Sequence, residues 1–139
     1  MVIARCLSYI REVDFKGLDL ERNQHVFLMR VVENPGINQE DLSQLLRIDK
    51  TTVAKALKKL EGKGYIKRVK SKKDLRSFNI WPTKKTQDIY PILLESILRT
   101  SEQGVADFTD EEMKQLLYLL EKYRKQIVIQ WEIAKKRVS

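Results

Sequence analysis

The stretch that begins at Asn38 constrains the fold more than any other part of this 139-residue chain, because it predicts two short helices in close succession. The Asn38 side chain is placed to accept hydrogen bonds from the free amides of the first helix. Asp49 is placed to cap the second helix, which is expected to run to about Glu61. Gly62 and Gly64 are expected to end it, since residues that tolerate positive φ commonly end helices.

Both predicted helices have an apolar face, because their apolar residues recur at helical spacing. These residues are Leu42, Leu45 and Leu46 in the first helix, and Val53, Leu57 and Leu60 in the second. The opposite face of the second helix carries Thr51, Lys55 and Lys58, flanked by Lys50, Thr52 and Lys59. Hydroxyls and long amines contact base edges and phosphates when a helix lies in a DNA major groove. Base contact is therefore predicted for most of this face and phosphate contact for Lys50, with a solvated helix face as the alternative.

A β-hairpin is predicted after the second helix, because alternating β-formers flank a polar, charged tip at residues 71–76. The flanking runs are residues 65–70 and 77–81. At such a tip, Lys72, Lys73 and Arg76 are able to reach past the helix to the neighbouring DNA backbone or minor groove. Two short helices followed by a basic hairpin form the outline of a winged helix-turn-helix. The predicted fold class is thus mainly α with a small β-hairpin wing.

Positive charge is concentrated on this predicted contact surface. Residues 50–76 hold 11 Lys or Arg and 2 Asp or Glu, a local balance of +9, whereas the whole chain carries +8 and the remainder therefore −1. Such a concentration is typical of a polyanion-binding surface and is not explained by general solubility.

Five segments resemble the MarR (multiple antibiotic resistance regulator) family of bacterial and archaeal transcription factors. They are NPGINQEDL (34–42), IDKTTV (48–53), LEGKGYI (60–66), DLRS (74–77) and FTDEE (108–112). Their order and spacing carry the resemblance from about Leu18 to the C-terminal region. The chain departs from the family pattern in its shorter N-terminal helix and in PTKKT at residues 82–86, where the family has Leu-Thr-x-x-Gly.

The resemblance implies roles for the hairpin residues. Arg76 matches the wing arginine that enters the minor groove, where narrow A·T-rich stretches deepen the negative potential. Asp74 matches the acidic residue that stabilises the wing by pairing with an arginine, here Arg76 or Arg68. The alternative for Asp74 is an ordinary turn aspartate. Lys72 and Lys73 are expected to add non-specific attraction.

Two helices are predicted before this region. The first covers residues 2 to about 15 and has apolar residues on one side, namely Ile3, Leu7 and Ile10. Gly17 interrupts that pattern. Asp19 is predicted to cap the second helix, which ends before Pro35.

Two longer helices are predicted after the hairpin. Thr83 is expected to cap the first, and Pro91 either bends that helix or marks its first turn. Thr109 and Glu112 form a capping-box pattern at the start of the last helix. Its apolar positions are Met113, Leu116, Leu117, Leu120, Tyr123, Ile127 and Trp131. A stripe of this length exceeds what a peripheral helix of a small monomer needs, so a twofold homodimer is predicted.

The resemblance implies the same homodimer, built by the N-terminal helix and the last two helices. Each helix-turn-helix then faces one half of a pseudo-palindromic operator in double-stranded DNA, with recognition helices about 34 Å apart. Residues 1–139 are expected to form one domain. About 20–82 would be the DNA-binding lobe, and about 1–17 and 83–139 the helical dimerisation region.

Other classes of protein find little support in the sequence. The chain has no apolar run of membrane length and no secretory signal, so a cytoplasmic protein is expected. It has no P-loop, no GxSxG, no paired His-Glu metal motif and no nucleophile with an obvious base. The sequence therefore predicts no enzyme, no catalytic residue, no metal and no cofactor.

Two residues invite a sensing role. Cys6, beside Arg5, is either an oxidant-sensing thiol, as in some members of the family, or a small packing residue, and packing is the preferred interpretation. His25 has no second His or Cys to form a metal site. Structural packing is preferred for it as well, with effector contact as the alternative.

The predicted function is a homodimeric, sequence-specific transcriptional regulator, a repressor relieved by a small-molecule effector. In the family such effectors are often phenolic or otherwise lipophilic anions. An activator, or a regulator without an effector, is an alternative within DNA binding. A different class is a winged-helix interaction module whose basic face docks on RNA or an acidic protein without operator specificity.

Overall fold

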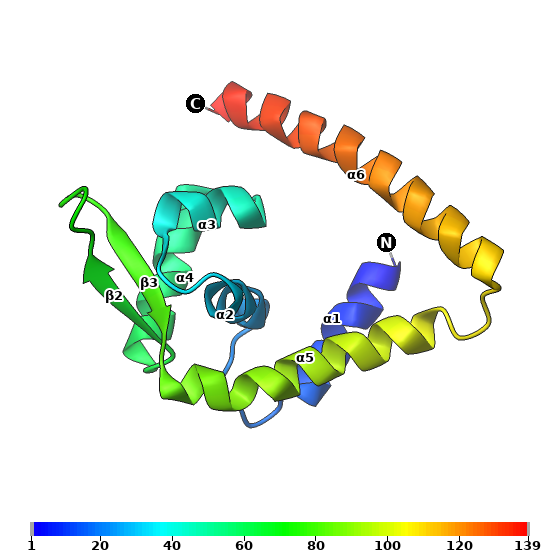
Figure 1. Cartoon of the computed structure of the whole chain (residues 1–139), viewed down its shortest axis with the longest axis horizontal. Coiled ribbons are helices and arrows are strands. Elements are labelled where there is room, and N and C mark those ends of the chain that lie inside the picture. Colours follow the sequence, from blue (N-terminus) through cyan, green and yellow to red (C-terminus); the bar gives the residue numbers. More distant parts are fainter. Residues whose placement is uncertain (1, 139) are drawn as a thin grey trace. The chain divides into compact units, whose positions relative to one another are not determined.

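A computed structural model describes residues 2–138 of the chain. Its elements in chain order are α1 (Val2–Asp14), α2 (Gln24–Glu33), β1 (Ile37–Asn38), α3 (Gln39–Leu46), α4 (Lys50–Gly62), β2 (Ile66–Lys70), β3 (Phe78–Pro82), α5 (Lys84–Gly104) and α6 (Asp110–Val138) (Figure 1). The chain divides into two compact units, residues 1–100 and residues 101–139. The first unit contains the winged helix-turn-helix, and the second contains α6.

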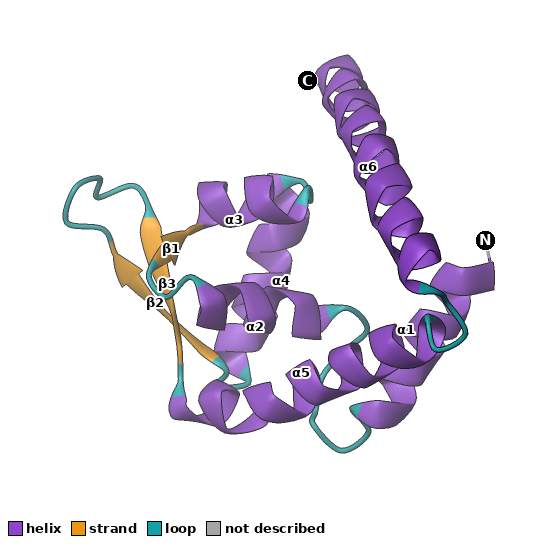
Figure 2. Ribbon diagram, turned by 45° about the vertical axis from the view of Figure 1, so that its right-hand side comes forward, coloured by secondary structure: helices purple, strands orange, loops and turns teal. Residues whose placement is uncertain are grey.

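The sheet is antiparallel, with β3 between β1 and β2 (Figure 2). Ile80 of β3 lies opposite both Ile37 and Arg68, one on each neighbouring strand. Gly36 donates its N–H to the Ile80 carbonyl at 2.8 Å, has a φ of +84°, and packs so closely on Trp81 that an added Cβ would lie 2.8 Å from the indole ring. The predicted fold class is confirmed, and β1 adds a short third strand to the predicted hairpin.

The core of the first unit is formed by α2, α3, α4, α5 and the sheet. Its fully buried members include Leu28, Val31, Leu42, Val53, Leu57, Leu60, Ile80 and Leu93. The predicted apolar face of α4 is confirmed in full. On the apolar face predicted for α3, Leu42 is fully buried, whereas Leu45 is 49% exposed and lies beside the loop of residues 34–37.

Polar side chains join α1 to α5. Arg11 donates through Nη1 to the Ser96 carbonyl at 3.0 Å, to Ser96 Oγ at 2.9 Å and to Thr100 Oγ1 at 2.8 Å. Asp14 pairs with Arg99 at 2.6 Å. The helix predicted at the N-terminus is confirmed, but none of its described residues is buried.

The prediction for the start of α2 is wrong. Asp19 does not cap α2, which begins at Gln24 after Asn23, a residue in the left-handed region whose side chain forms no cap. Asp19 is instead held by a lysine of α4, as described below. Pro91 lies inside α5, so the first-turn alternative is excluded. Thr83 lies directly before α5, but the hydrogen bonds of its hydroxyl go to the Gly64 and Tyr65 carbonyls and not to the first amides of α5, as a cap would require.

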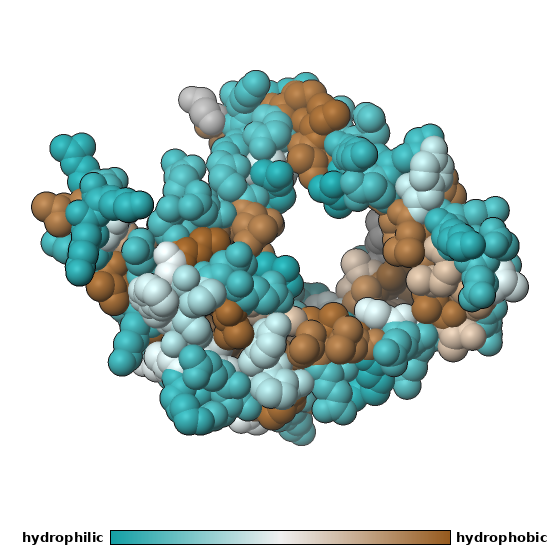
Figure 3. All heavy atoms as spheres, viewed as in Figure 1, coloured by the Kyte–Doolittle hydropathy of each residue, from teal (hydrophilic) through white to brown (hydrophobic). Residues whose placement is uncertain are grey.

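The helix α6 starts with the predicted capping box. Thr109 N–H donates to Glu112 Oε2 at 2.9 Å, and Glu112 N–H donates to Thr109 Oγ1 at 3.1 Å. Within the described part of α6 no residue is buried. Apolar side chains therefore lie at its surface (Figure 3). None of the described helices is long and apolar enough to cross a membrane.

Candidate nucleic-acid interface

The helix-turn-helix is built by two capped helices and a tight turn. Asn38 Oδ1 accepts from the Asp41 N–H at 2.8 Å, and Asp49 Oδ1 accepts from the Thr52 N–H at 2.8 Å. Hydrogen bonds from the Thr52 hydroxyl and N–H lower the pKa of the Asp49 carboxyl, so that it stays ionised as the cap of α4. In the turn, Arg47 adopts a left-handed conformation with a φ of 55°. Both predicted caps are confirmed.

The outward face of α4 carries the predicted DNA-contacting side chains. Thr51, Thr52, Lys55 and Lys58 are all exposed. Their orientation follows from the burial of Val53, Leu57 and Leu60 on the other side of the same helix. A face of hydroxyls and amines is thereby held outward by a rigid apolar face, which is the arrangement that a major-groove helix requires.

Two lysines of the predicted set carry acidic partners. Lys50 pairs with Glu40 of α3. Lys59 pairs with Glu21 of the α1–α2 loop at 2.8 Å. These partners come from other segments, so sequence spacing gave no signal for them.

The wing consists of β2, β3 and the tip between them, residues 71–77. The Ser71 N–H donates to the Ser77 carbonyl at 3.0 Å and closes the tip. Lys72, Lys73 and Arg76 are exposed there, as predicted. Lys72 and Lys73 also line a surface depression that includes Glu40 of α3, the partner of Lys50. The start of α4 and the wing tip therefore share one side of the lobe.

The predicted pairing of Asp74 with an arginine side chain is wrong. The Arg68 guanidinium binds Glu61 Oε2 through Nε at 2.8 Å and through Nη2 at 2.6 Å, and lies over the Phe78 ring. Asp74 Oδ1 instead accepts the backbone N–H of Arg76 at 3.0 Å. Asp74 thus shapes the tip as a turn aspartate, while Arg68 and Glu61 join β2 to the end of α4.

The residues considered for sensing lie outside this surface. Cys6 is exposed on α1. His25 is half-buried at the start of α2, its ring 5.1 Å from that of Phe15. Burial, together with the charge of Arg11, lowers the pKa of His25 to about 4. Within residues 2–138, no cluster of His, Cys, Asp or Glu is arranged to hold a metal.

A cavity of about 280 Å³ lies beside His25. It is bordered by the end of α1, the α1–α2 loop, the start of α2 and Lys63. Its lining is mixed in charge: Arg11 and Arg22 lie beside the Phe15 ring, and Glu12, Asp19 and Glu21 border the same space. The effector-contact alternative for His25 indicated this position, but sequence spacing gave no signal for the other lining residues.

These features define a winged-helix protein with a basic surface for duplex DNA. The chain belongs to the MarR family of transcriptional regulators. The MarR family model matches residues 20–78. A relative, the uncharacterized HTH-type transcriptional regulator YybA of Bacillus subtilis, is 39% identical and the match covers 97% of this chain and 90% of that protein.

Two further comparisons concern function. The homoprotocatechuate degradative operon repressor of Escherichia coli is 30% identical, with 84% of this chain and 78% of that protein covered. A MarR family regulator from Listeria monocytogenes, solved in complex with a 26mer DNA, superimposes with a TM-score of 0.90 at 36% identity, covering 97% of this chain and 90% of that one. The chain is thus a DNA-binding transcriptional regulator of this family.

Proposed function

We propose that two copies of the chain bind a pseudo-palindromic operator, with one α4 in each of two successive major grooves. The observation that carries this proposal is the outward face of α4, where Thr51, Thr52 and Lys55 are exposed above a fully buried apolar face. In this arrangement Lys55 donates to guanine acceptors, and the threonines contact thymine methyl groups or phosphates.

The flanking residues fix the lobe on the DNA backbone. Lys50 and Lys58 contact phosphates on either side of the groove, and Lys72 and Lys73 add attraction from the wing. Arg76 enters the minor groove from the tip that Asp74 shapes. The start of α4 and the wing tip lie on the same side of the lobe, and this supports the assignment of both to the DNA backbone and minor groove.

Dimerisation uses the helices outside the lobe. About residues 20–82 form the DNA-binding lobe, and about 1–17 and 83–139 form the dimerisation region. The support is the exposed apolar stripe of α6, in which Leu120, Tyr123 and Ile127 are 52%, 61% and 47% exposed. Surfaces of this kind mark association sites on water-soluble proteins.

The regulator acts as a repressor that a small molecule relieves. Repression rather than activation is supported by the similarity to the homoprotocatechuate degradative operon repressor. The effector, a small lipophilic or phenolic anion, binds the cavity beside His25, which Phe15, Arg11 and Arg22 line together with three carboxylates. It lowers DNA affinity only by favouring a spacing of the two α4 helices that does not fit successive grooves.

Selection of bound sequences from random duplex DNA, followed by titration at matched salt, tests the proposal. The expected result is a palindromic site bound at least 10³-fold more tightly than scrambled DNA, on the order seen for specific regulators. Equal affinity for both duplexes would favour the interaction module that docks on RNA or an acidic protein. Recovery of single half-sites would reject the dimer.

A further inference from the structure

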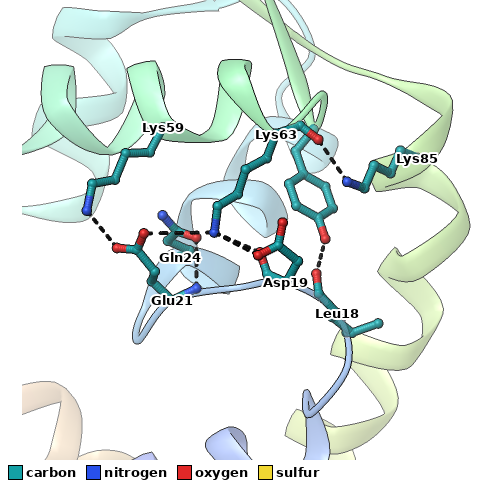
Figure 4. Close-up of polar contacts among 8 residues, drawn as sticks. Leu18, Asp19, Glu21, Gln24, Lys59, Lys63 and Lys85 are labelled. Carbon is teal, nitrogen blue, oxygen red and sulfur yellow. Dashed lines mark hydrogen bonds and ion pairs between the residues drawn. The ribbon is translucent and has the colours of Figure 1, made fainter.

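The loop between α1 and α2 is tied to the end of α4 by charged side chains (Figure 4). Lys59 Nζ lies 2.8 Å from Glu21 Oε2. Lys63, which follows α4, donates to the Asp19 carbonyl oxygen at 2.9 Å and lies 3.2 Å from Asp19 Oδ1 and 3.8 Å from Glu21 Oε1. We call these four side chains the loop–helix cluster: Asp19, Glu21, Lys59 and Lys63.

The loop side of this cluster is held in a fixed conformation. Asp19 has a φ of 50°, a left-handed value that non-glycine residues adopt when surrounding contacts hold them there. The buried Gln24 accepts the Glu21 N–H through Oε1 at 2.9 Å and donates its own N–H to the Glu21 carbonyl at 3.0 Å. The Tyr65 hydroxyl donates to the Leu18 carbonyl. Glu21 therefore presents its carboxylate from a rigid loop.

The helix side of the cluster is held by contacts from the α1–α2 loop and from α5. Lys59 is exposed, as Lys55 and Lys58 are, but its ammonium is paired with Glu21. The Lys63 side chain is only 22% exposed, and Lys85 of α5 donates to its carbonyl at 2.8 Å. The hydrogen bond from Lys59 lowers the pKa of the Glu21 carboxyl, which stays ionised at neutral pH. Asp19 and Glu21 thus balance the charges of Lys59 and Lys63.

We infer that Glu21, supported by Asp19, is a positioning residue for DNA recognition. Through Lys59 it fixes the direction of α4, so that Thr51 and Lys55 meet the base edges. Lys59 is thereby assigned to the loop–helix cluster and not to the DNA contacts predicted from the sequence. The inference rests on the proposed function.

The cluster is suited to positioning as well as to stability. An isolated exposed ion pair contributes little to folding, but a network of several charges contributes more, and urea unfolding separates the two roles. Side chains that read bases need to be held within a fraction of an ångström by the residues behind them. A small rotation of α4 would leave Val53 and Leu57 in the core and still move Lys55 away from a base.

Two models for Lys59 predict opposite signs. If Lys59 contacts a phosphate, Glu21 competes with the DNA, and Glu21→Gln tightens binding to every duplex. If Glu21 positions α4, the same variant weakens binding to the selected operator, even though it adds positive charge beside the interface. Electrostatics alone does not produce that second result.

The experiment compares Glu21→Gln, Lys59→Met, the double variant, and the exchanged pair Glu21→Lys with Lys59→Glu. Each full-length protein is titrated with the selected operator and with scrambled DNA over a range of salt concentrations. Glu111→Gln is the matched control, because it removes a carboxylate from an exposed ion pair on α6 and changes the net charge equally. Urea unfolding of each variant reports folding separately.

If Glu21 positions α4, each single variant lowers the ratio of operator affinity to scrambled-DNA affinity roughly threefold to tenfold. The double variant then shows a loss no larger than that of either single variant. The exchanged pair restores the preference for the operator over scrambled DNA, although it places a glutamate on α4. The dependence of its DNA affinity on salt concentration stays that of the wild type. The control is unchanged.

Three results would overturn the inference. One is tighter binding of Glu21→Gln to all duplexes. Another is a salt slope lowered by about one in Lys59→Met without restoration by the exchanged pair, which marks a phosphate contact. The third is wild-type discrimination in all variants. If the wild-type protein itself shows no preference for any duplex, the proposed function fails, and that outcome is distinct from these three.

Discussion

The winged-helix lobe and the helix α6 differ in where their apolar side chains lie. In the lobe, Leu28, Leu57 and Ile80 are fully buried in one core formed by α2, α3, α4 and the sheet, on which α5 packs through Leu93. In α6, Leu120 and Tyr123 are more than half exposed, and none of the described residues is buried. Most helices in proteins are stabilised by packing an apolar face, so the comparison indicates two sources of stability. The lobe is stabilised within one chain, and α6 is expected to be stabilised by association.

The largest expected effect is a core substitution in the lobe. Leu57→Ala removes a fully buried side chain and is expected to lower the free energy of unfolding by about 2–5 kcal/mol, with loss of operator binding. Urea unfolding followed by circular dichroism measures this. The matched control is Leu75→Ala at the wing tip, where the side chain is 74% exposed and the change is expected to stay within about 0.5 kcal/mol. Similar losses in both variants would show that the lobe lacks the core described.

The second-largest expected effect is a weaker dimer, caused by a substitution in α6 that leaves the lobe unchanged. Leu120→Glu places a charge in the apolar stripe and is expected to raise the dimer dissociation constant at least about 30-fold, or about 2 kcal/mol. Sedimentation velocity over a range of protein concentrations measures it. Gln126→Glu introduces the same charge beside the stripe and is expected to leave the dimer intact. A dimer that tolerates Leu120→Glu would mean that α6 is not the association surface.

The third prediction separates DNA recognition from dimerisation. Lys55→Ala is expected to relax sequence preference at one position of each half-site by about 1–3 kcal/mol. Lys72→Ala on the wing is expected to weaken all duplexes alike and to lower the salt slope by about one. Both variants remain dimers, unlike Leu120→Glu. Identical behaviour of the two lysine variants would contradict the division into base and phosphate contacts.

The features that the sequence predicted correctly depend on neighbouring residues. Asn38, Asp49 and the pair Thr109 and Glu112 cap helices whose amides lie within three positions along the chain, so local chemistry was sufficient. The buried face of α4 followed from helical periodicity for the same reason. The basic outer face followed in turn, since a helix with one buried side has one exposed side.

The features that the sequence missed depend on segments distant in the chain. Glu21 and Lys59 are 38 residues apart, and no spacing rule links them. Asp19 resembled a helix cap because a helical pattern follows it, but Lys63 holds it elsewhere. Glu61 rather than Asp74 binds Arg68, because β2 runs back past the end of α4. In each case the partner was chosen by the packing of elements, which one-dimensional patterns do not record.

The smallest expected effect is a pH dependence confined to the lobe. Burial, together with the charge of Arg11, lowers the pKa of His25 to about 4 from an ordinary value of 6.5. Between these values the unfolded chain binds a proton that the folded chain does not, so stability is highest above pH 6.5 and falls as the pH drops toward 4. At pH 5 the loss is expected to be about 1 kcal/mol, after allowance for the solvent that reaches part of the ring.

Urea unfolding at pH 5 and pH 7.5 tests this in the wild type and in His25→Gln. His25 is the only histidine in the chain, so most of the difference between the two pH values is expected to disappear in the variant. The apolar stripe of α6 contains no group that titrates in this range, and the dimer dissociation constant is therefore expected to stay constant between the same pH values. An equal pH dependence in both proteins would place the titrating group elsewhere. A dimer that weakens in parallel with the lobe would show that the two units do not have separate sources of stability.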